Sequence, residues 1–160
     1  MTTLETRRAT LQDGQTMARL AMELGYDCDE TSMRRRLLAI RSEADHAIFV
    51  ASTEGGKVVG WIHIETRRGL LVDHYAQIDA LIVGSPHRGI GVGRALMERA
   101  TDWAYKLELD RIRVRTQTHR EGAIAFYEHL GYKRLKEQRV YEYVRGQGEK
   151  PEPVITLVDR

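Results

Sequence analysis

A strand pattern, a glycine-rich stretch and a helical pattern follow one another between residues 75 and 107, and this succession constrains the fold more than any other feature. The segment "YAQIDALIV" at 75–83 is typical of a strand. Val92, Leu96, Ala100, Trp103 and Leu107 then recur at helical spacing. Between them, "GIGVG" at 89–93 places three glycines in five positions. Glycine at such a junction opposes folding, because it has the most conformational freedom to lose. We therefore expect a ligand that must approach the backbone closely there.

Length, charge and cysteine content narrow the class of protein. A chain of 160 residues with 42% hydrophobic and 30% charged residues is ordinary for one soluble domain. No apolar run approaches the ~20 residues of a membrane helix, and the first residues lack a secretory signal, so we expect a cytoplasmic protein that binds no membrane. The net charge of +2 argues against a nucleic-acid partner. The single cysteine, Cys28, excludes a disulfide framework and the usual four-ligand zinc site, and we expect no metal.

The remaining patterns predict an α+β layout. Strands are expected from Leu4, at 46–53, 57–67, 75–83 and 111–114, with one or two closing strands in "YKRLKEQRVYEYV" at 132–144. The sequence Glu54-Gly55-Gly56 predicts a hairpin turn. Helices are expected from the N-cap candidate Asp13 to Gly25, around 33–40, from Val92, and over a short stretch that Gly131 ends.

Two prolines, Pro151 and Pro153, mark the edge of the compact part of the chain. We expect one domain over residues 1–146 and a tail over residues 147–160. Within this tail, "VITLVD" is either a loose end or a strand that is added to, or swapped with, a neighbouring sheet.

Three known anion-binding loops can be compared with the glycine-rich stretch, because a strand, a glycine loop and a helix start bring unpaired N–H groups together. A Walker A loop needs a lysine where this chain has Ile90, which argues against a nucleotide-triphosphate enzyme. A dinucleotide fingerprint needs a third glycine where this chain has Arg94. The third pattern, R/Q-x-x-G-x-G/A, is matched from Arg88 to Gly93.

Two motifs carry a resemblance to one family. The hexapeptide from Arg88 to Gly93 resembles the coenzyme A pyrophosphate loop of the GNAT superfamily of acyl-CoA-dependent N-acyltransferases, and "REGAIAFYEHLGYKR" at 120–134 resembles its second signature. The resemblance spans residues 4–145. It implies the GNAT fold, with a central mixed, mostly antiparallel sheet of six to seven strands flanked by about four helices. It also implies acetyl-CoA as co-substrate and a primary amine as acceptor.

The resemblance implies how acetyl-CoA is held. In the family the cofactor lies where two neighbouring parallel strands splay apart, with a bulge on the first, and here these strands are at 75–83 and 111–116. Backbone groups near Leu81 and Val83 would pair with the pantetheine amides, and the Val83 N–H would polarise the thioester carbonyl. The implied cofactor-binding residues are Leu81, Ile82, Val83, Arg88, Gly89, Ile90, Gly91, Val92, Gly93, Arg94, Arg120, Ala123, Phe126 and Tyr127.

Tyr127 is the candidate general acid. The leaving thiolate must gain a proton, and tyrosine at this place in the family motif commonly supplies it. A phenol with an ordinary pKa of ~10 is protonated at neutral pH and can do so. The alternative is an aromatic side chain packed beneath the cofactor. Arg120 stands where the family usually has an asparagine that touches the pantetheine arm, so this contact is replaced by a phosphate contact or lost to solvent.

The general base is less determined by the resemblance. Related enzymes often place a glutamate where this chain has Gln77, and an amide cannot accept the proton. Strand alternation places Gln77 and Asp79 on one face, so Asp79 is the candidate base, directly or through water, or else the anchor of the substrate ammonium. His63, His74 and His119 are alternatives. Cys28 has no evident helper, which argues against an acyl-cysteine intermediate.

The acceptor amine is expected between "GYDCDETSMRRR" and "RRGLLVDHY", which bracket the acceptor cleft in this family. Tyr26 and Asp27, together with Gln77 and Asp79, form the predicted substrate-binding set. Asp29 and Glu30 add to an acidic rim that suits a cationic amine, or else they cap a helix. Nearby arginines argue instead for an anionic acceptor.

These residues predict an N-acetyltransferase that acts on a small-molecule amine in a ternary complex. The alternatives are a non-catalytic acyl-CoA sensor, which Gln77 would suit, and a protein or peptide N-acetyltransferase. Family members commonly dimerise, so a homodimer is expected.

Overall fold

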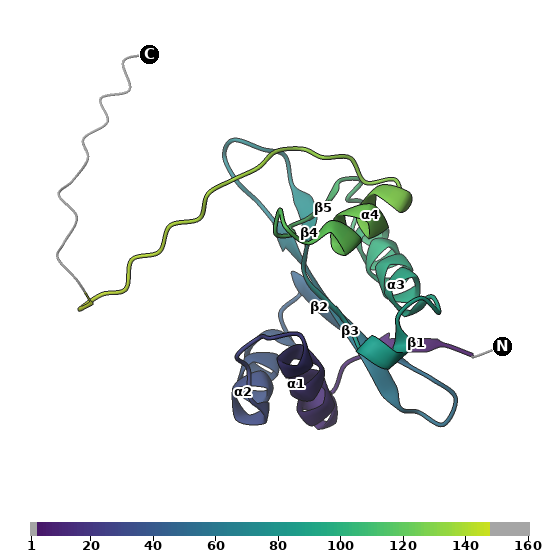
Figure 1. Cartoon of the computed structure of the whole chain (residues 1–160). Helices are drawn as coiled ribbons and strands as arrows, with labels where there is room; N and C mark the ends of the chain where they lie inside the picture. Colours follow the sequence, from purple (N-terminus) through teal and green to yellow (C-terminus); the bar gives the residue numbers. More distant parts are fainter. Residues whose placement is uncertain (1–2, 148–160) are drawn as a thin grey trace, which may run out of the picture. The chain divides into compact units, whose positions relative to one another are not determined.

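A computed structural model describes residues 3–147, and the chain divides into two compact units between Arg115 and Thr116. The first unit is a sheet with helices on both of its faces (Figure 1). Its elements, in chain order, are β1 (Glu5–Arg8), the 3-10 helix η1 (Leu11–Asp13), α1 (Gly14–Glu23), α2 (Glu30–Ile40), β2 (His46–Ser52), β3 (Val58–Arg67), β4 (Tyr75–Val83), the 3-10 helix η2 (Ser85–His87), α3 (Val92–Lys106) and β5 (Ile112–Val114). The second unit contains α4 (Glu121–His129).

The strands of the first unit form one sheet in the order β1-β2-β3-β4-β5. The first four strands are antiparallel to their neighbours, whereas β5 runs parallel to β4. The predicted α+β class, the mixed and mostly antiparallel sheet and the four α-helices are therefore confirmed. Within residues 3–147 the sheet has five strands, fewer than the six to seven expected.

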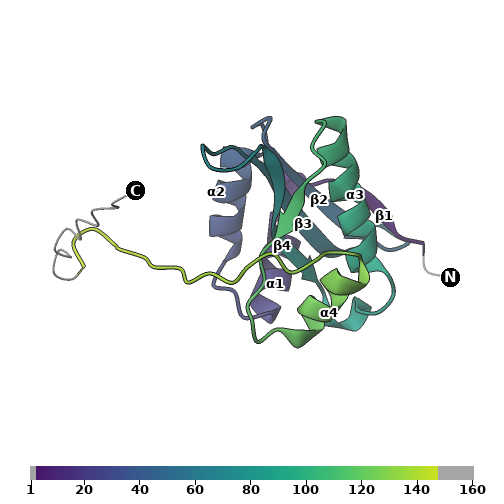
Figure 2. The ribbon, with the colours of Figure 1, turned by 90° about the horizontal axis from the view of Figure 1, so that it is seen from above.

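Neighbouring residues of β3 show which helices cover which face of the sheet. The Trp61 indole N–H donates to the Met17 carbonyl of α1 at 3.1 Å. Next to Trp61, Gly60 leaves room for α3, because a Cβ there would lie 2.9 Å from Val92 Cγ1. Successive strand residues point to opposite faces. Helices α1 and α2 therefore cover one face, and α3 covers the other (Figure 2).

The centre of the sheet is apolar on both faces. Burying each Leu, Ile, Val or Met side chain there stabilises the fold by about 1.5–3 kcal/mol. The face under α1 and α2 contains the buried side chains Met17, Leu20, Met33, Leu37, Ile48, Val50, Trp61 and Ile82. Polar side chains on this face gather instead at one end of β2, β3 and β4, which is where the candidate site lies.

Asp13 stands at the predicted N-cap position of α1, but its side chain does not cap that helix. Its carboxylate accepts two hydrogen bonds from the Arg7 guanidinium and one from the Thr10 N–H, each at 2.8 Å. Burial raises the pKa of Asp13, but these hydrogen bonds outweigh it and hold the pKa below its ordinary value. The Arg7–Asp13 ion pair thus links β1 to the start of α1.

Asp13→Asn is expected to lower the free energy of unfolding by about 1–3 kcal/mol at neutral pH, because the bidentate contact with Arg7 is lost. A carboxyl whose pKa is lowered in the folded state stabilises fully above its unfolded pKa of ~3.9, and loses this effect as the pH falls through the folded pKa. Urea unfolding should show that the free energy of unfolding of wild type exceeds that of Asp13→Asn by less at pH 3 than at pH 7. The exposed Asp102→Asn is the matched control, and an advantage equal at both pH values would contradict the assignment.

The second unit corrects one prediction. The helix α4 is followed by Gly131 at φ +92°, as expected for its end. The one or two closing strands predicted at 132–144 are wrong, because no strand is present there and Leu135, Val140 and Tyr141 are exposed. An alternation of apolar and polar residues does not by itself make a strand, because the hydrogen bonds of a strand need a neighbouring segment to pair with. The tail segment "VITLVD" lies outside the described residues. None of the helices within residues 3–147 is long and apolar enough to cross a membrane.

Candidate active site

The strands β4 and β5 pair over a short stretch and then part. Their parallel ladder runs from Ala76 opposite Ile112 to Ile78 opposite Val114, whereas β4 continues to Val83. Within the first unit, residues 79–83 of β4 therefore have no partner on the β5 side. This divergence is the splay that the family resemblance predicted.

Backbone groups of Leu81 and Val83 point toward this open side of β4. The Gly84 N–H donates to the Val59 carbonyl of the β3 side at 2.9 Å. Backbone groups alternate in direction along a strand, so those of Leu81 and Val83 point away from β3. A peptide-like ligand such as the pantetheine arm can pair with them there. Ile82 is buried in the core, so its side chain supports this edge from within.

The glycine loop leaves its backbone open to an approaching ligand. Gly89 and Gly91 have φ of +79° and +93°, and a Cβ at either would meet no atom within 4 Å. The first helical hydrogen bond of α3 runs from the Ala95 N–H to the Gly91 carbonyl, so the preceding N–H groups have no intrahelical partner. The backbone there is shaped by its glycines and faces open space. Of the predicted loop residues, Arg88, Ile90 and Arg94 are exposed, whereas Val92 is buried and can offer only its backbone.

A bulge on β4 presents Asp79. Opposite β3, His63 pairs with Ala80 and Ile64 pairs with Ile78, which leaves Asp79 as the extra residue. The Gln77 amide donates to Asp79 Oδ1 at 2.8 Å, which confirms that these two side chains lie on one face. The side chain of Asp79 is 21% exposed, so a substrate can reach it.

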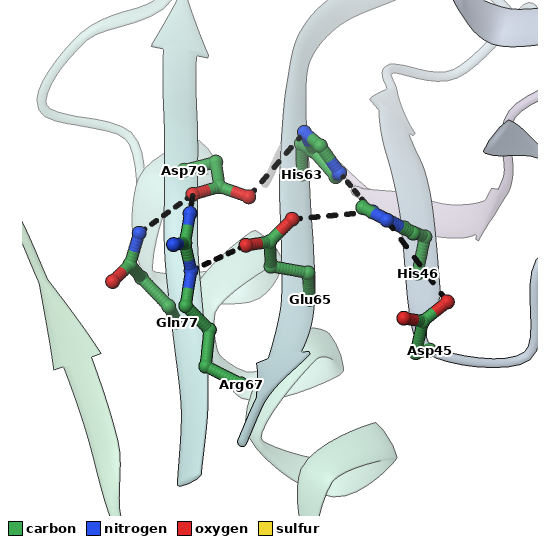
Figure 3. Close-up of polar contacts among 7 residues, drawn as sticks. All are labelled: Asp45, His46, His63, Glu65, Arg67, Gln77 and Asp79. Atoms are coloured by element: carbon green, nitrogen blue, oxygen red, sulfur yellow. Dashed lines mark hydrogen bonds and ion pairs between the residues drawn. The ribbon is translucent and has the colours of Figure 1, made fainter. Parts of the chain in front are cut away.

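Asp79 belongs to a row of polar side chains that crosses three strands, which we call the polar cluster (Figure 3). His63 Nδ1 lies 3.8 Å from Asp79 Oδ2, and His63 Nε2 lies 2.9 Å from His46 Nδ1. Arg67 Nε forms an ion pair with Glu65 Oε1. The polar cluster comprises Asp45, His46, His63, Glu65, Arg67, Gln77 and Asp79.

Glu65 is the functional candidate that sequence reasoning missed. It pairs in register with Gln77 across β3 and β4, so its carboxylate lies beside the position where the family glutamate would stand. Its side chain is 16% exposed. The alternation of His63, Glu65 and Arg67 along β3 was visible in the sequence. Their alignment with Gln77 depends on the β3–β4 register, which the sequence of the connecting loop does not specify.

Burial and neighbouring charges shift the pKa of two groups in the polar cluster. Burial raises the pKa of Glu65, and the charge of Asp79 and a hydrogen bond with it raise it further, against the opposing effects of Arg67 and His46. Burial lowers the pKa of His63, with His46 acting in the same direction and Asp79 opposing. At neutral pH His63 is therefore a neutral imidazole, and Glu65 is a stronger proton acceptor than an exposed glutamate.

One group within the described residues has a composition that could hold a metal ion. The ligand atoms of His46, His63 and Glu65 lie within 4.8 Å of one another. The two imidazoles stack with their ring centroids 5.2 Å apart and share a direct 2.9 Å hydrogen bond. Each ring therefore already has a partner for one nitrogen.

Several predicted site residues belong to other elements of the chain than the strands that carry the polar cluster. Tyr26 follows the end of α1, and Asp27 is exposed in the loop before α2. Asp29 caps α2 by accepting from the Ser32 N–H at 2.7 Å, so the capping alternative holds for that residue. The predicted residues of the second signature, Arg120, Ala123, Phe126 and Tyr127, belong to the second unit. There the Tyr127 ring makes edge contacts with Phe126 and Tyr132.

The match to a known family decides the class of the protein. Residues 14–132 match the family model described as the acetyltransferase (GNAT) family. The chain belongs to the GNAT family. Among the relatives of this GNAT protein, an uncharacterized N-acetyltransferase, YjgM, of Escherichia coli is 29% identical over 139 residues, which cover 81% of each chain. The N-alpha-acetyltransferase 30 of Saccharomyces cerevisiae is 29% identical over 83 residues, 52% of this chain and 46% of the yeast protein, so the match spans about half of that relative.

Solved structures agree on the fold. Glucosamine-6-phosphate N-acetyltransferase from Arabidopsis thaliana matches with a TM-score of 0.75 at 21% identity, over 89% of this chain and 99% of that chain. The aminoglycoside 6'-N-acetyltransferase AAC(6')-Ih from Acinetobacter baumannii matches with a TM-score of 0.77 at 13% identity, over 90% and 100%. At these identities the likeness establishes the fold alone.

Proposed function

We propose that this GNAT protein transfers an acetyl group from acetyl-CoA to a primary amine of a small molecule, by direct attack while both are bound. One observation carries the proposal. A single strand, β4, combines the open backbone edge at Leu81 and Val83 with the Asp79 carboxylate at its bulge. The backbone edge that would bind the acyl carrier is thus only two to four residues along β4 from Asp79, a carboxylate that could accept a proton.

The residues that would hold acetyl-CoA are the open edge of β4 and the glycine loop. Backbone groups of Leu81 and Val83 bind the amide-bearing arm, and N–H groups between Arg88 and Arg94 bind the diphosphate. When bound, acetyl-CoA supplies a thioester as the acetyl donor. The Val83 N–H donates a hydrogen bond to the carbonyl oxygen, where negative charge develops during the transfer.

Proton transfer is the remaining task of the protein. A primary ammonium with a pKa of ~10 is only about one part in a thousand neutral at pH 7, so a group must accept its proton. The carboxylate pair of Asp79 and Glu65 serves this need. Tyr127 gives its phenolic proton to the leaving sulfur. The support for Tyr127 is its place in the second signature of the family.

An amine panel tests the proposed function. Polyamines, aminoglycosides, amino sugars, aminophosphonates, amino acids and peptides with free α-amino or lysine groups are incubated with acetyl-CoA, and release of free thiol is recorded. We expect turnover with at least one small amine that exceeds turnover with every peptide. Calorimetry with acetyl-CoA and with ATP accompanies the panel, and only acetyl-CoA should bind.

Two results would overturn the proposed function. Binding of acetyl-CoA without turnover on any amine indicates an acyl-CoA sensor, the reading that Gln77 suits. Peptide turnover above that of all small amines indicates a peptide acetyltransferase, as the name of the yeast relative suggests for that protein.

A further inference from the structure

The proposed reaction releases one proton per turnover, and this proton needs a path out of the site. The acceptor nitrogen enters as an ammonium and leaves as an amide, so two of its N–H bonds break. One proton replaces the one that Tyr127 gives to the sulfur, which leaves as a thiol. The other must reach water. The polar cluster offers both an acceptor for it and an exit.

Glu65 is placed to accept this proton. It lies opposite Gln77 in the β3–β4 ladder, close enough to Asp79 for that carboxylate to raise its pKa. Asp79 Oδ1, in turn, accepts a hydrogen bond from the Gln77 amide at 2.8 Å and lies 3.8 Å from Arg67 Nη2. A carboxylate that already accepts these groups is better suited to hold an ammonium than to take its proton.

His46 connects Glu65 to the surface. Its Nδ1 lies 3.5 Å from Glu65 Oε2, and its Nε2 lies 4.0 Å from Asp45 Oδ1. The Asp45 side chain is 59% exposed, whereas that of His46 is 19% exposed. An imidazole can take a proton on one nitrogen while it releases one from the other. The distances and the gradient of exposure both lead outward from Glu65.

We propose that Glu65 takes the ammonium proton, that His46 passes it to Asp45 and water, and that Asp79 stays ionised and anchors the ammonium. The inference rests on the proposed function and divides its carboxylate pair into two roles. In balanced form, an N–H bond of the ammonium breaks and an O–H bond forms on Glu65. The proton then binds His46 Nδ1, which gives up its 2.9 Å hydrogen bond with His63 Nε2, and the His46 Nε2 proton leaves to Asp45 or water.

The charged groups around Glu65 agree with this assignment. Those that face it are Asp79 of β4, Arg67 and His63 of β3, and His46 with Asp45 at the start of β2. Their combined effect with burial is the raised pKa of Glu65, which favours proton acceptance. The wild-type rate is therefore expected to fall on the acid side as Glu65 becomes protonated.

The test compares Glu65→Gln with Asp79→Asn over pH 6 to 10, using an amine found in the panel. At pH 7, Glu65→Gln should lower kcat/KM about 100-fold, the scale of general-base catalysis. The defect should shrink about tenfold per pH unit toward the amine pKa, because free amine needs no base. Asp79→Asn should mainly raise the KM for the amine. Its fall in rate on the acid side should begin at a lower pH than in wild type, because the Asp79 charge that raises the pKa of Glu65 is removed.

Controls separate the proton role from folding. The exposed Glu54→Gln, in the β2–β3 turn, should match wild type throughout. Acetyl-CoA affinity, measured by calorimetry, should be unchanged in Glu65→Gln. That variant should also be no less stable than wild type at neutral pH, since it removes a carboxyl whose ionisation the fold disfavours. A Glu65→Gln loss below threefold, or a loss equal at every pH, overturns the inference. So does a pH-dependent defect that appears in Asp79→Asn instead.

His46→Gln tests the exit. We expect a loss of about tenfold in kcat that added imidazole buffer partly restores, with the exposed His129→Gln as control. No loss in kcat removes His46 from the path. Metal content, measured on purified protein, decides the other use of these ligands: a stoichiometric divalent ion with activity lost to a chelator overturns the relay. Wild-type protein that acetylates no amine overturns the proposed function itself, whereas active wild type with an unaffected Glu65→Gln variant overturns only this inference.

Discussion

Gly91→Val is expected to lose acetyl-CoA affinity by at least about 100-fold while the protein stays folded. Gly91 has φ +93°, a conformation that a β-branched residue adopts only under strain. The new side chain would also project into the open space in front of the loop, where no protein atom lies within 4 Å of a Cβ. A 100-fold loss corresponds to about 2.7 kcal/mol of binding free energy. Calorimetry with acetyl-CoA measures it.

Gly55→Val is the matched control for this loop prediction. Gly55 has φ +92° in the β2–β3 turn and also has no atom within 4 Å of a Cβ, so the backbone strain is the same. It should lower the melting temperature about as much as Gly91→Val and leave acetyl-CoA affinity unchanged. Equal affinities in the two variants would show that the loop does not hold the diphosphate.

Tyr127→Phe is expected to lower kcat by about 100- to 1,000-fold and to leave acetyl-CoA affinity unchanged. The variant removes only the hydroxyl, which is the proton donor in the proposed function. The ring keeps its edge contacts with Phe126 at 5.2 Å and Tyr132 at 5.9 Å between centroids, so α4 should keep its fold. Thiol release under saturating amine and acetyl-CoA gives kcat, and calorimetry gives the affinity.

Tyr132→Phe serves as the control in the same unit, since Tyr132 has no proposed part in the transfer. It should keep the wild-type kcat. A Tyr127→Phe variant with unchanged kcat would assign the phenol to packing beneath the cofactor. The proton of the leaving thiol would then come from water or from another group.

Local patterns were enough to predict most of the first unit. The β2–β3 hairpin, β4 at 75–83, the start of α3 at Val92 and the end of α1 before Gly25 follow from periodicity and turn residues that act within a few positions. The predicted strands at 132–144 failed because a strand depends on a partner that its own sequence does not supply. Asp13 shows the same limit on a smaller scale. Its position fits an N-cap, but the bidentate contact with Arg7 of β1 takes its carboxylate instead.

The candidate site was predicted in the part that β4 and the loop carry by themselves. Gln77 and Asp79 are two positions apart, so their contact follows from one strand. Glu65 was missed because its place beside Gln77 depends on how two strands align. The His46–His63 contact joins residues 17 positions apart in sequence and needs the β2–β3 register as well. Side chains that cooperate across strands are therefore the part that one sequence does not reveal.

The bulge adds Asp79 to β4 without changing which residues of that strand pack against the core. Ile78 pairs with Ile64 and Ala80 pairs with His63, which are neighbours on β3. Ile78 and Ala80 therefore point to opposite faces of the sheet, as two consecutive residues of a regular strand would. Asp79 is thus an extra residue that the alternation of side chains between the two faces does not need. Its side chain can therefore change without repacking the hydrophobic residues of either face. Under the proposed function, such a change would alter which acceptor amine is preferred while the hydrophobic interior stays the same.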